Sequence, residues 1–258
     1  MQDIFEMAKC RLKSIWGFVM ILAIWYGAKK AFDVPSYMLP SPLEVVQALL
    51  ELTKTGQLFK SAVASLFRVT WGFYLAVVTA VPIGLFMGRV ARFRQVLNPI
   101  IQFLRPISPL AWIPMALMWF GIGDKPAIFL IYLSAFFPMV VFTVSGVAGI
   151  KETFLRVAEN FGLRGRHLYM KVILPAALPE IIVGLRITLG TAWLVIVAAE
   201  MIAVKSGLGY LIIDARNSLR MDKVVAGMVV IGAIGLILDY LIRLLERLPW
   251  LEWSRMRR

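Results

Sequence analysis

Polar residues that could do chemistry are few in this chain, and they lie far apart in the sequence. Glu200 interrupts the apolar stretch VAAEMIAV, and His167 is the single histidine. One histidine excludes a multi-histidine metal site within the chain, and the single Cys10 excludes an intrachain disulfide. The sequence contains no H-E-x-x-H, no G-x-S-x-G and no G-x-x-x-x-G-K-[ST] motif. It therefore predicts no catalytic, metal, cofactor or nucleotide site on this chain.

The few polar residues inside apolar runs can have a functional role or a purely structural one. A carboxylate at membrane depth is costly unless it is paired or hydrated. Glu200 therefore either lines a translocation path or gate, or pairs with a cation such as Lys205. Asp239 and Arg243 lie four residues apart, which is the spacing of a local ion pair on a helix. Arg186 begins an apolar run, where its side chain can snorkel to the interface.

The composition is that of a membrane protein built from helices. Of the 258 residues, 60% are hydrophobic and 17% are charged, and the mean hydropathy is +0.80. Soluble domains carry about 25% charged residues, and about 20 apolar residues cross a bilayer as a helix. No sustained period-two alternation supports a lipid-spanning barrel. We predict an all-α polytopic membrane protein. The net charge of +13 then reflects Lys and Arg in cytoplasmic loops rather than nucleic-acid binding.

Six apolar runs predict six transmembrane helices. They cover residues 14–28, 69–87, 99–121, 126–150, 181–204 and 224–245. Three basic residues precede the first run, so we expect its N-terminus to be cytoplasmic and the segment to be an uncleaved anchor. With this orientation, 17 of the 28 Lys and Arg residues fall in inner segments and ten in outer ones. The bias predicts that both termini are cytoplasmic.

Two segments depart from a simple span. Residues 31–68 are amphipathic, and SPLE at 41–44 has the pattern of a capping box with proline at the first helical position. We expect a surface helix there, on the outside. The run 99–121 contains Pro106, Pro109 and Pro114, and proline removes a helix hydrogen bond. It predicts either a broken helix that lines a pathway, with Pro109, Trp112 and Pro114 beside it, or a packing kink.

The inner loop at 151–180 is too ordered for a simple tether. Its sequence, KETFLRVAENFGLRGRHLYMKVILPAALPE, has helix-forming stretches broken at Gly162 and Gly165 and ended by Pro175. We expect two short helices joined by a sharp glycine turn, one of them along the membrane surface as a docking surface. The alternative is a surface loop with interfacial anchoring.

The loop resembles the EAA loop of bacterial ABC importer permeases, whose signature is Glu-Ala-Ala, three residues, Gly, nine residues, Ile-x-Leu-Pro. Gly162 matches the glycine, Ala158 the second alanine, and Leu174 and Pro175 the Leu-Pro pair. Arg156 and Val157 replace the glutamate and first alanine, and Glu159 is out of register. Other stretches over about 35–245, including LPSPLEVVQAL, AWIPMALMWFGIG, LPAALPEIIVGLR, WLVIVAAEMI and GLGYLI, resemble the branch that handles nitrate, aliphatic sulfonates, taurine and bicarbonate.

The resemblance implies a type I permease fold and a coupling role for the loop. It implies one permease domain over 1–258, with a core at about 60–245 and a coupling loop at about 151–180. Arg156, Ala158, Glu159, Gly162, Leu174 and Pro175 are the residues that it assigns to coupling. The loop would sit in a groove of a separate ATPase, which binds ATP and Mg²⁺. An extracytoplasmic binding protein, a second permease copy and membrane lipid complete the expected partners, in a bacterial inner membrane.

Three classes of function are open to a membrane protein of this kind. The first is ATP-driven import of a small anion, with aliphatic sulfonate or taurine ahead of nitrate or bicarbonate. The second is a membrane-embedded enzyme, for which no catalytic constellation is present. The third is a secondary transporter driven by an ion gradient, which would need mid-membrane carboxylates and an internal repeat. No clear repeat occurs, and Glu200 lies near the end of its run.

Overall fold

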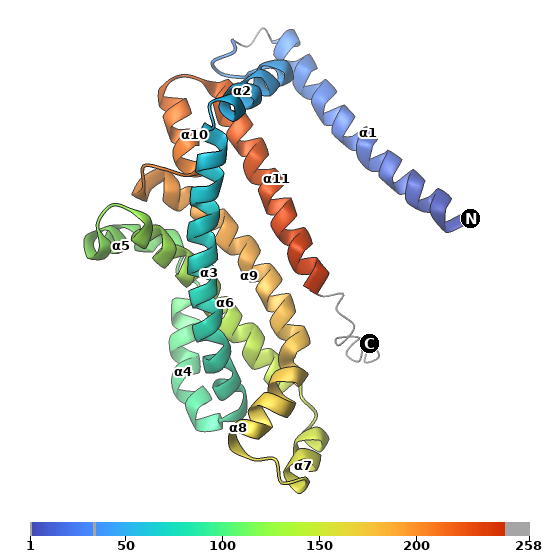
Figure 1. Ribbon diagram of the computed structural model, residues 1–258, viewed down its shortest axis with the longest axis vertical. Helices are drawn as coiled ribbons and strands as arrows, with labels where there is room; N and C mark the ends of the chain where they lie inside the picture. The colour runs from blue at the N-terminus through green and yellow to red at the C-terminus, as the bar shows by residue number, and fades with distance from the viewer. Residues whose placement is uncertain (1, 33–34, 246–258) are drawn as a thin grey trace. The chain divides into compact units, whose positions relative to one another are not determined.

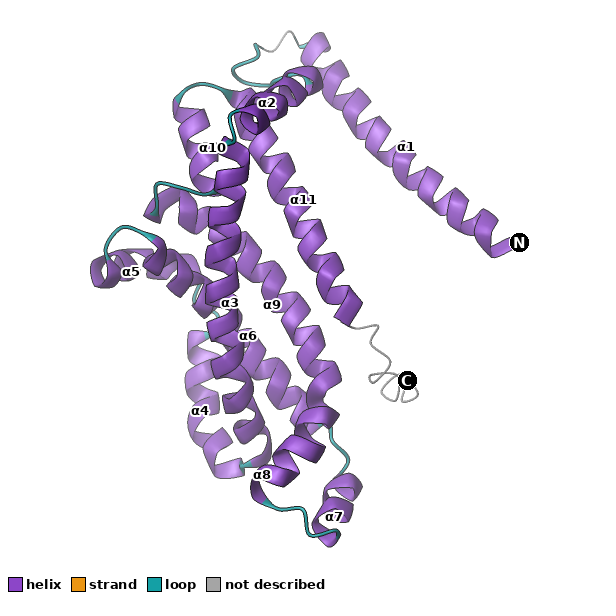
Figure 2. Cartoon of the chain, viewed as in Figure 1, coloured by secondary structure: helices purple, strands orange, loops and turns teal. Residues whose placement is uncertain are grey.

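The computed structural model describes residues 2–32 and 35–245, and within them every regular element is helical (Figures 1 and 2). The chain divides into two parts, residues 1–60 with 211–230 and residues 61–210 with 231–258, and each is described by itself. The elements are α1 (Gln2–Ala31), α2 (Pro42–Lys54), α3 (Gln57–Arg89), α4 (Ala91–Leu104), η1 (Pro109–Trp112), α5 (Ile113–Phe120), α6 (Asp124–Ala148), α7 (Glu152–Asn160), α8 (Gly165–Leu168), η2 (Tyr169–Ile173), α9 (Leu174–Ala203), α10 (Leu208–Asn217) and α11 (Met221–Leu245).

Four helices among the described residues are long and apolar enough to cross a membrane: Gln57–Arg89, Asp124–Ala148, Gly165–Ala203 and Met221–Leu244. The prediction of several apolar spans is confirmed, and the expected spans at 126–150 and 224–245 agree with α6 and α11. The first expected span, 14–28, falls within α1. Part of that run has side chains outside the described residues, so its passage through the membrane stays a prediction.

The expected boundaries of two spans were wrong. The second helix begins at Gln57 rather than at 69, because residues 57–68 continue into the apolar run without a break in the helix. Arg68, which precedes the expected span, is therefore inside α3, and only 3% of its side chain is exposed. The fifth span likewise begins before 181, since the helical path from Gly165 to Ala203 is continuous.

The proline-rich third run is a broken helix. The segments Ala91–Leu104 and Pro109–Phe120 meet at an angle of 86°, too sharp for one straight span. A short 3₁₀ helix, η1, follows the break, and neither it nor α5 has a side-chain cap. The choice between a pathway and a packing kink depends on what surrounds the break.

The first part of the chain is held by the expected helix cap. Ser41 Oγ accepts the Glu44 N–H at 3.2 Å, and Glu44 accepts the Ser41 N–H at 2.7 Å, which confirms the capping box. Lys29 binds the same carboxylate at 2.9 Å. This hydrogen bond to Lys29 and the one from the Ser41 backbone lower the pKa of Glu44 to about 2. Glu44 thus stays ionised at neutral pH.

The buried face of α2 packs within the same part of the chain. Val45, Ala48 and Leu52 form a small core with Leu211 and Ala226. On the polar side, α2 forms ion pairs with the start of α11 and with the residue just before it. Glu51 lies 2.8 Å from Arg220 and 2.7 Å from Lys223, and these hydrogen bonds lower the pKa of the Glu51 carboxyl.

The core of the second part depends on close contact between α3 and α6. A Cβ added at Gly84 would lie 2.5 Å from Thr143 Cβ and 3.1 Å from the Val140 carbonyl oxygen. Small residues let transmembrane helices approach closely, and Gly84 and Gly88 have the GxxxG spacing. The main cluster of buried residues joins these two helices to α7, η2 and α9. The position of α7 and η2 therefore depends on the packing of α3 against α6.

We expect Gly84→Ala to lower the stability of the purified protein, because the added methyl group overlaps Thr143. Overpacking of this kind costs about 1–3 kcal/mol. Gly190→Ala is the matched control: it is also a helix glycine, but a Cβ there meets nothing within 4 Å. It should be neutral or slightly stabilising, because alanine favours the helix. Thermal unfolding in detergent measures both. An equal melting temperature for the two variants would contradict the predicted contact.

Candidate functional site

The inner segment contains a helix that ends in a left-handed glycine turn. Helix α7 ends at Asn160, and Gly162 follows with φ +76°. The Gly162 N–H donates to the Glu159 carbonyl at 2.9 Å, and the Leu163 N–H donates to the Ala158 carbonyl at 3.0 Å. This pair of bonds is the Schellman motif, which favours glycine at the left-handed position. The spacing from Ala158 to Gly162 is therefore the spacing of a helix terminator.

One face of α7 is anchored and the other is exposed. Leu155 and Ala158 are each 6% exposed and belong to the main buried cluster. Phe154, Val157 and Phe161 are 52%, 47% and 82% exposed. A helix with three exposed apolar side chains has the character of an interaction surface. The prediction of two short helices around a glycine turn is confirmed by α7 and α8.

Two ion pairs accompany this helix. Glu159 pairs with Arg89, at the end of α3, at 3.1 Å. Arg156 lies 3.7 Å from Glu152 on the exposed face, where such a pair adds little stability. Arg156, Ala158, Glu159 and Gly162 thus lie together on α7 and its turn.

Pro175 does not end a helix, contrary to our expectation. It lies in the first turn of α9, and the helix runs through it. The turn before it, η2 (Tyr169–Ile173), is a π-helix in which the Leu174 N–H donates to the Tyr169 carbonyl. Pro175 has no N–H, so it cannot form the usual bond to the residue four positions earlier. The wider π turn accommodates this loss, and Leu174 and Pro175 begin α9 rather than belong to the glycine turn.

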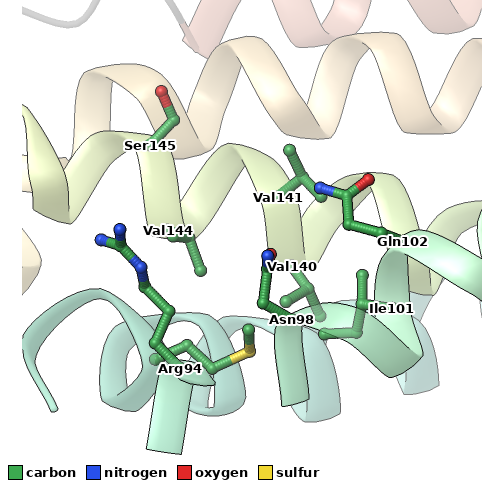
Figure 3. A pocket seen from close by; sticks show the side chains of 9 residues that line it. Arg94, Asn98, Ile101, Gln102, Val140, Val141, Val144 and Ser145 are labelled. Atoms are coloured by element: carbon green, nitrogen blue, oxygen red, sulfur yellow. The ribbon is translucent and has the colours of Figure 1, made fainter. Parts of the chain in front are cut away.

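Two pockets lie along the broken third run. One, of about 290 Å³, is lined by Arg105, Ile107, Pro109 and Trp112 at the break and by side chains of α6 and α9. The other, of about 250 Å³, is lined by Arg94, Asn98, Ile101 and Gln102 of α4 with residues of α3 and α6 (Figure 3). The break therefore borders a pocket, which favours the pathway reading. Pro109 and Trp112 face it, whereas Pro114 and Glu200 do not line either pocket.

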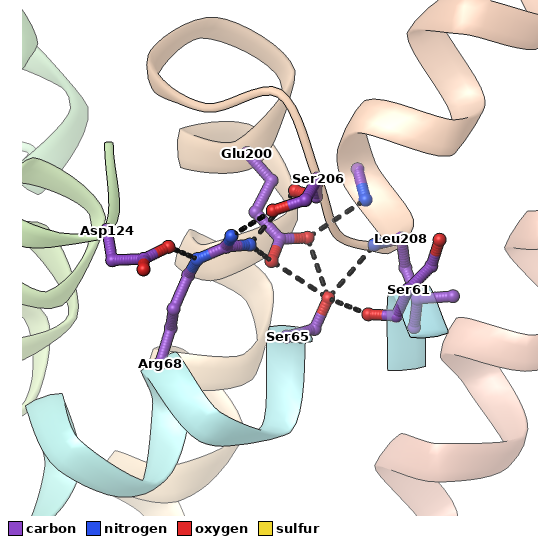
Figure 4. A network of polar contacts seen from close by, with 8 residues as sticks. Ser61, Ser65, Arg68, Asp124, Glu200, Ser206 and Leu208 are labelled. Atoms are coloured by element: carbon purple, nitrogen blue, oxygen red, sulfur yellow. Dashed lines mark hydrogen bonds and ion pairs between the residues drawn. The ribbon is translucent and has the colours of Figure 1, made fainter. Parts of the chain in front are cut away.

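Glu200 lies at the centre of a closed polar cluster (Figure 4). Its side chain is 0% exposed. Arg68 Nη1 donates to Glu200 Oε1 at 2.5 Å, Ser65 Oγ lies 2.8 Å from both carboxylate oxygens, and the Gly209 N–H donates at 3.0 Å. The cation that pairs with it is thus Arg68 of α3, rather than Lys205. A buried carboxylate with this many donors is well compensated for its loss of water.

Arg68 extends the cluster to α6 and to the loop after α9. Its Nε donates to Asp124 at 2.7 Å, its Nη1 donates to the Ser206 carbonyl at 2.9 Å, and its Nη2 donates to Ser206 Oγ. The Asp124 side chain is 54% exposed. One guanidinium therefore joins α3, α6, α9 and the 204–207 loop, with its one exposed partner at the edge.

The glycines after α9 are required by this carboxylate. Gly207 has φ +103°, and a Cβ there would collide with the Glu200 carboxylate. A Cβ at Gly209 would collide with the Val197 carbonyl and lie 2.8 Å from Glu200 Cβ. Only glycine allows the backbone to approach so closely. The sequence signals for the buried cluster are therefore Glu200 within its apolar run and the two glycines of GLG at 207–209.

The pair predicted near the end of the last span is confirmed but has a further member. Arg243 Nε donates to Asp239 at 2.8 Å, and Arg186 Nε donates to the same carboxylate at 2.7 Å. Arg186 therefore joins α9 to α11 instead of only snorkelling to the interface. Its partner lies 53 residues away, and no local pattern reveals that contact.

The fold and site define a class of protein. Long apolar helices, a broken helix beside pockets, and a short helix with an exposed apolar face describe the membrane subunit of a transporter. The sequence matches the family described as binding-protein-dependent transport system inner membrane component over residues 80–249. The chain belongs to this family, and it is the membrane subunit of an ABC importer.

Similar proteins agree with this assignment. The taurine transport system permease protein TauC of Escherichia coli is 36% identical, over 92% of this chain and 89% of TauC. The putative aliphatic sulfonates transport permease protein SsuC of Bacillus subtilis is 38% identical, over 91% of this chain and 84% of SsuC. A structure of the inward-facing MetNI methionine ABC transporter matches with a TM-score of 0.59 and 19% identity, over 72% of this chain and 95% of that one. That likeness supports the fold.

We expect Glu200→Ala to lower stability by about 3–5 kcal/mol, because it leaves the Arg68 guanidinium buried without its carboxylate. The double variant Arg68→Met/Glu200→Leu should cost clearly less than the single one, since no buried charge remains. Glu152→Ala, which breaks the exposed pair with Arg156, is the control and should cost well under about 1 kcal/mol. Unfolding in detergent, followed by tryptophan fluorescence, gives all three values. A double variant that is as destabilised as Glu200→Ala, or more so, would argue against a coupled pair.

Proposed function

We propose that this chain carries a small anion across the bacterial inner membrane, with aliphatic sulfonate or taurine as the first candidates. Nitrate and bicarbonate are the alternatives within the same branch. The names of the relatives TauC and SsuC support the sulfonate reading. A binding protein would deliver the anion, and family membership favours this scheme over a carrier driven by an ion gradient.

The coupling role of the 151–180 segment is carried by the two faces of α7. Leu155 and Ala158 fix the helix to the core, while Phe154, Val157 and Phe161 are exposed toward a partner. A helix with one buried face transmits force without bending away from its anchor. The partner is a separate ATPase subunit, which binds ATP and Mg²⁺, since this chain has no phosphate-binding motif. The chain itself then acts as a transport subunit without an ATPase site.

The assembly that fits this scheme is symmetric. One coupling segment occurs in the chain, so two ATPase subunits require two permeases, and a homodimer is the usual symmetric arrangement. The distribution of Lys and Arg supports cytoplasmic N- and C-termini, which places α7 on the side of the ATPase. In this arrangement Pro109 and Trp112 line the translocation path, Pro114 supports the helix break, and the Glu200 cluster closes one end as a gate.

Gly162→Arg should separate the permease from its ATPase while the protein stays folded in the membrane. The long cation would strain a turn with φ +76° and project beside the exposed face of α7. We expect loss of ATPase copurification and at least a tenfold drop in ATP-driven uptake. Tagged permease would be co-expressed with the products of its neighbouring genes and solubilised. The amount of ATPase that copurifies and the rate of ATP-driven uptake would then be measured.

Gly56→Arg is the matched control for this experiment. Gly56 also has a left-handed φ, +68°, with nothing within 4 Å of an added Cβ, but it lies in the turn between α2 and α3. The Gly56→Arg variant should copurify with the ATPase and should take up the anion as wild type does. Unchanged uptake in Gly162→Arg, or equal loss in Gly56→Arg, would contradict the coupling assignment.

The substrate is tested separately with the wild-type complex. Uptake of labelled taurine or ethanesulfonate into proteoliposomes that contain the permease, the ATPase and the binding protein should depend on ATP. Excess unlabelled nitrate or bicarbonate should compete weakly. Strong competition by either inorganic anion would move the assignment to that anion.

A further inference from the structure

Helix α4 carries a polar face that joins the two pockets. Arg94, Asn98 and Gln102 are spaced four residues apart, and all three line the smaller pocket. Arg105 keeps helical backbone angles of φ −55° and ψ −43° at the end of the helix, and it lines the larger pocket. Residues at i, i+4, i+8 and i+11 share one helix face. Figure 3 shows the first three side chains extending from α4 toward α6.

The two guanidiniums on this face have no carboxylate partner among the described residues. In the second part, Arg68, Arg89, Arg156, Arg186 and Arg243 form ion pairs within 4.0 Å. The other described arginines there, which are Arg92, Arg94, Arg105, Arg164 and Arg166, form none, and of these only Arg94 and Arg105 line either pocket. No such pair involves Arg94 or Arg105. Ionisable residues within membrane-spanning segments face the protein interior or a water-filled cavity, and they mark ion or substrate paths. The planar fork of arginine also matches the oxygens of an oxyanion.

The residues that line the larger pocket limit the kind of anion that it can bind. Beside Arg105, its lining is mostly apolar, from Trp112, Leu133, Phe137 and Leu194. Two hydroxyl residues, Ser134 and Thr191, complete the polar part. A cation against an apolar wall suits an anion that has both an oxyanion head and a short alkyl chain. Nitrate and bicarbonate have no part that would use the apolar wall.

We propose that the face formed by Arg94, Asn98, Gln102 and Arg105 is the inner section of the anion path, with the larger pocket as a subsite for a short alkanesulfonate. The inference rests on the proposed function and specifies the substrate class. Arg105 would hold the sulfonate while the alkyl chain contacts the apolar wall. Asn98 and Gln102 would offer amide donors toward Arg94. The anion would thus exchange one guanidinium for another along α4.

The test compares uptake with ATP hydrolysis in the reconstituted complex of permease, ATPase and binding protein. Arg105→Gln should lower ATP-driven ethanesulfonate uptake at least tenfold, and Arg94→Gln/Arg105→Gln further. ATP hydrolysis stimulated by the loaded binding protein should stay within about twofold of wild type. Arg105→Lys should recover part of the uptake, because it restores the charge. Arg92→Gln is the matched control on the same helix, since Arg92 lines neither pocket, and it should transport as wild type does.

Each contrary result has a defined meaning. Uptake within twofold of wild type in the double variant, or equal loss in Arg92→Gln, would overturn the inference and leave the proposed function intact. Wild-type complex that takes up nitrate or bicarbonate but not ethanesulfonate would overturn the alkanesulfonate subsite. A transport loss seen in vesicles with phosphatidylglycerol but absent in pure phosphatidylcholine would assign the guanidiniums to lipid headgroups, and would also overturn it. Wild type that imports none of these anions would refute the proposed function itself.

Discussion

A single buried ion pair, Arg68 with Glu200, holds together the helices on which the rest of the second part is built. The guanidinium reaches α3, α6 and the loop after α9, and the carboxylate accepts donors from α3 and from the start of α10. Such a pair costs much to bury and more to break, because either partner alone would remain charged without compensation. The same cluster explains why glycine is needed at 207 and 209. The ion pair therefore constrains both the helix packing and the local sequence.

From this fixed end, the helices lead to two regions with different physical character. The broken helix at 105–108 borders pockets that contain cations and apolar walls. The inner end carries α7, whose buried face belongs to the same cluster of residues as α3, α6 and α9. A displacement of α7 must therefore also displace the helices that line the pockets. This continuity of packing is what a subunit driven from outside the membrane requires, since packed interiors transmit strain rather than absorb it.

Most local patterns in the sequence predicted the structure correctly, whereas contacts between distant residues were not predicted. Apolar length predicted the spans, SPLE predicted the cap of α2, and the glycines at 162 and 165 predicted the turn after α7. The partner of Glu200 lies 132 residues away, so proximity along the chain suggested Lys205 instead of Arg68. The reading of Pro175 as a helix end failed because a π turn, which has no sequence pattern of its own, accommodates the missing N–H. The candidate pathway residues were only partly brought together, because Pro114 and Glu200 do not line the pockets that Pro109 and Trp112 line.

The π turn at Tyr169–Ile173 has a consequence for how the inner segment meets α9. A π turn contains one residue more than an α turn, and each residue of an α-helix turns the chain by about 100° and advances it by about 1.5 Å. Converting these five residues to α geometry would rotate α8 and the chain before it by that angle about the axis of α9. Such a change would reorient α7 without breaking the helix that continues through α9. The turn beside Pro175 thus acts as a register adjustment of one residue, positioned where the inner segment joins the longest span.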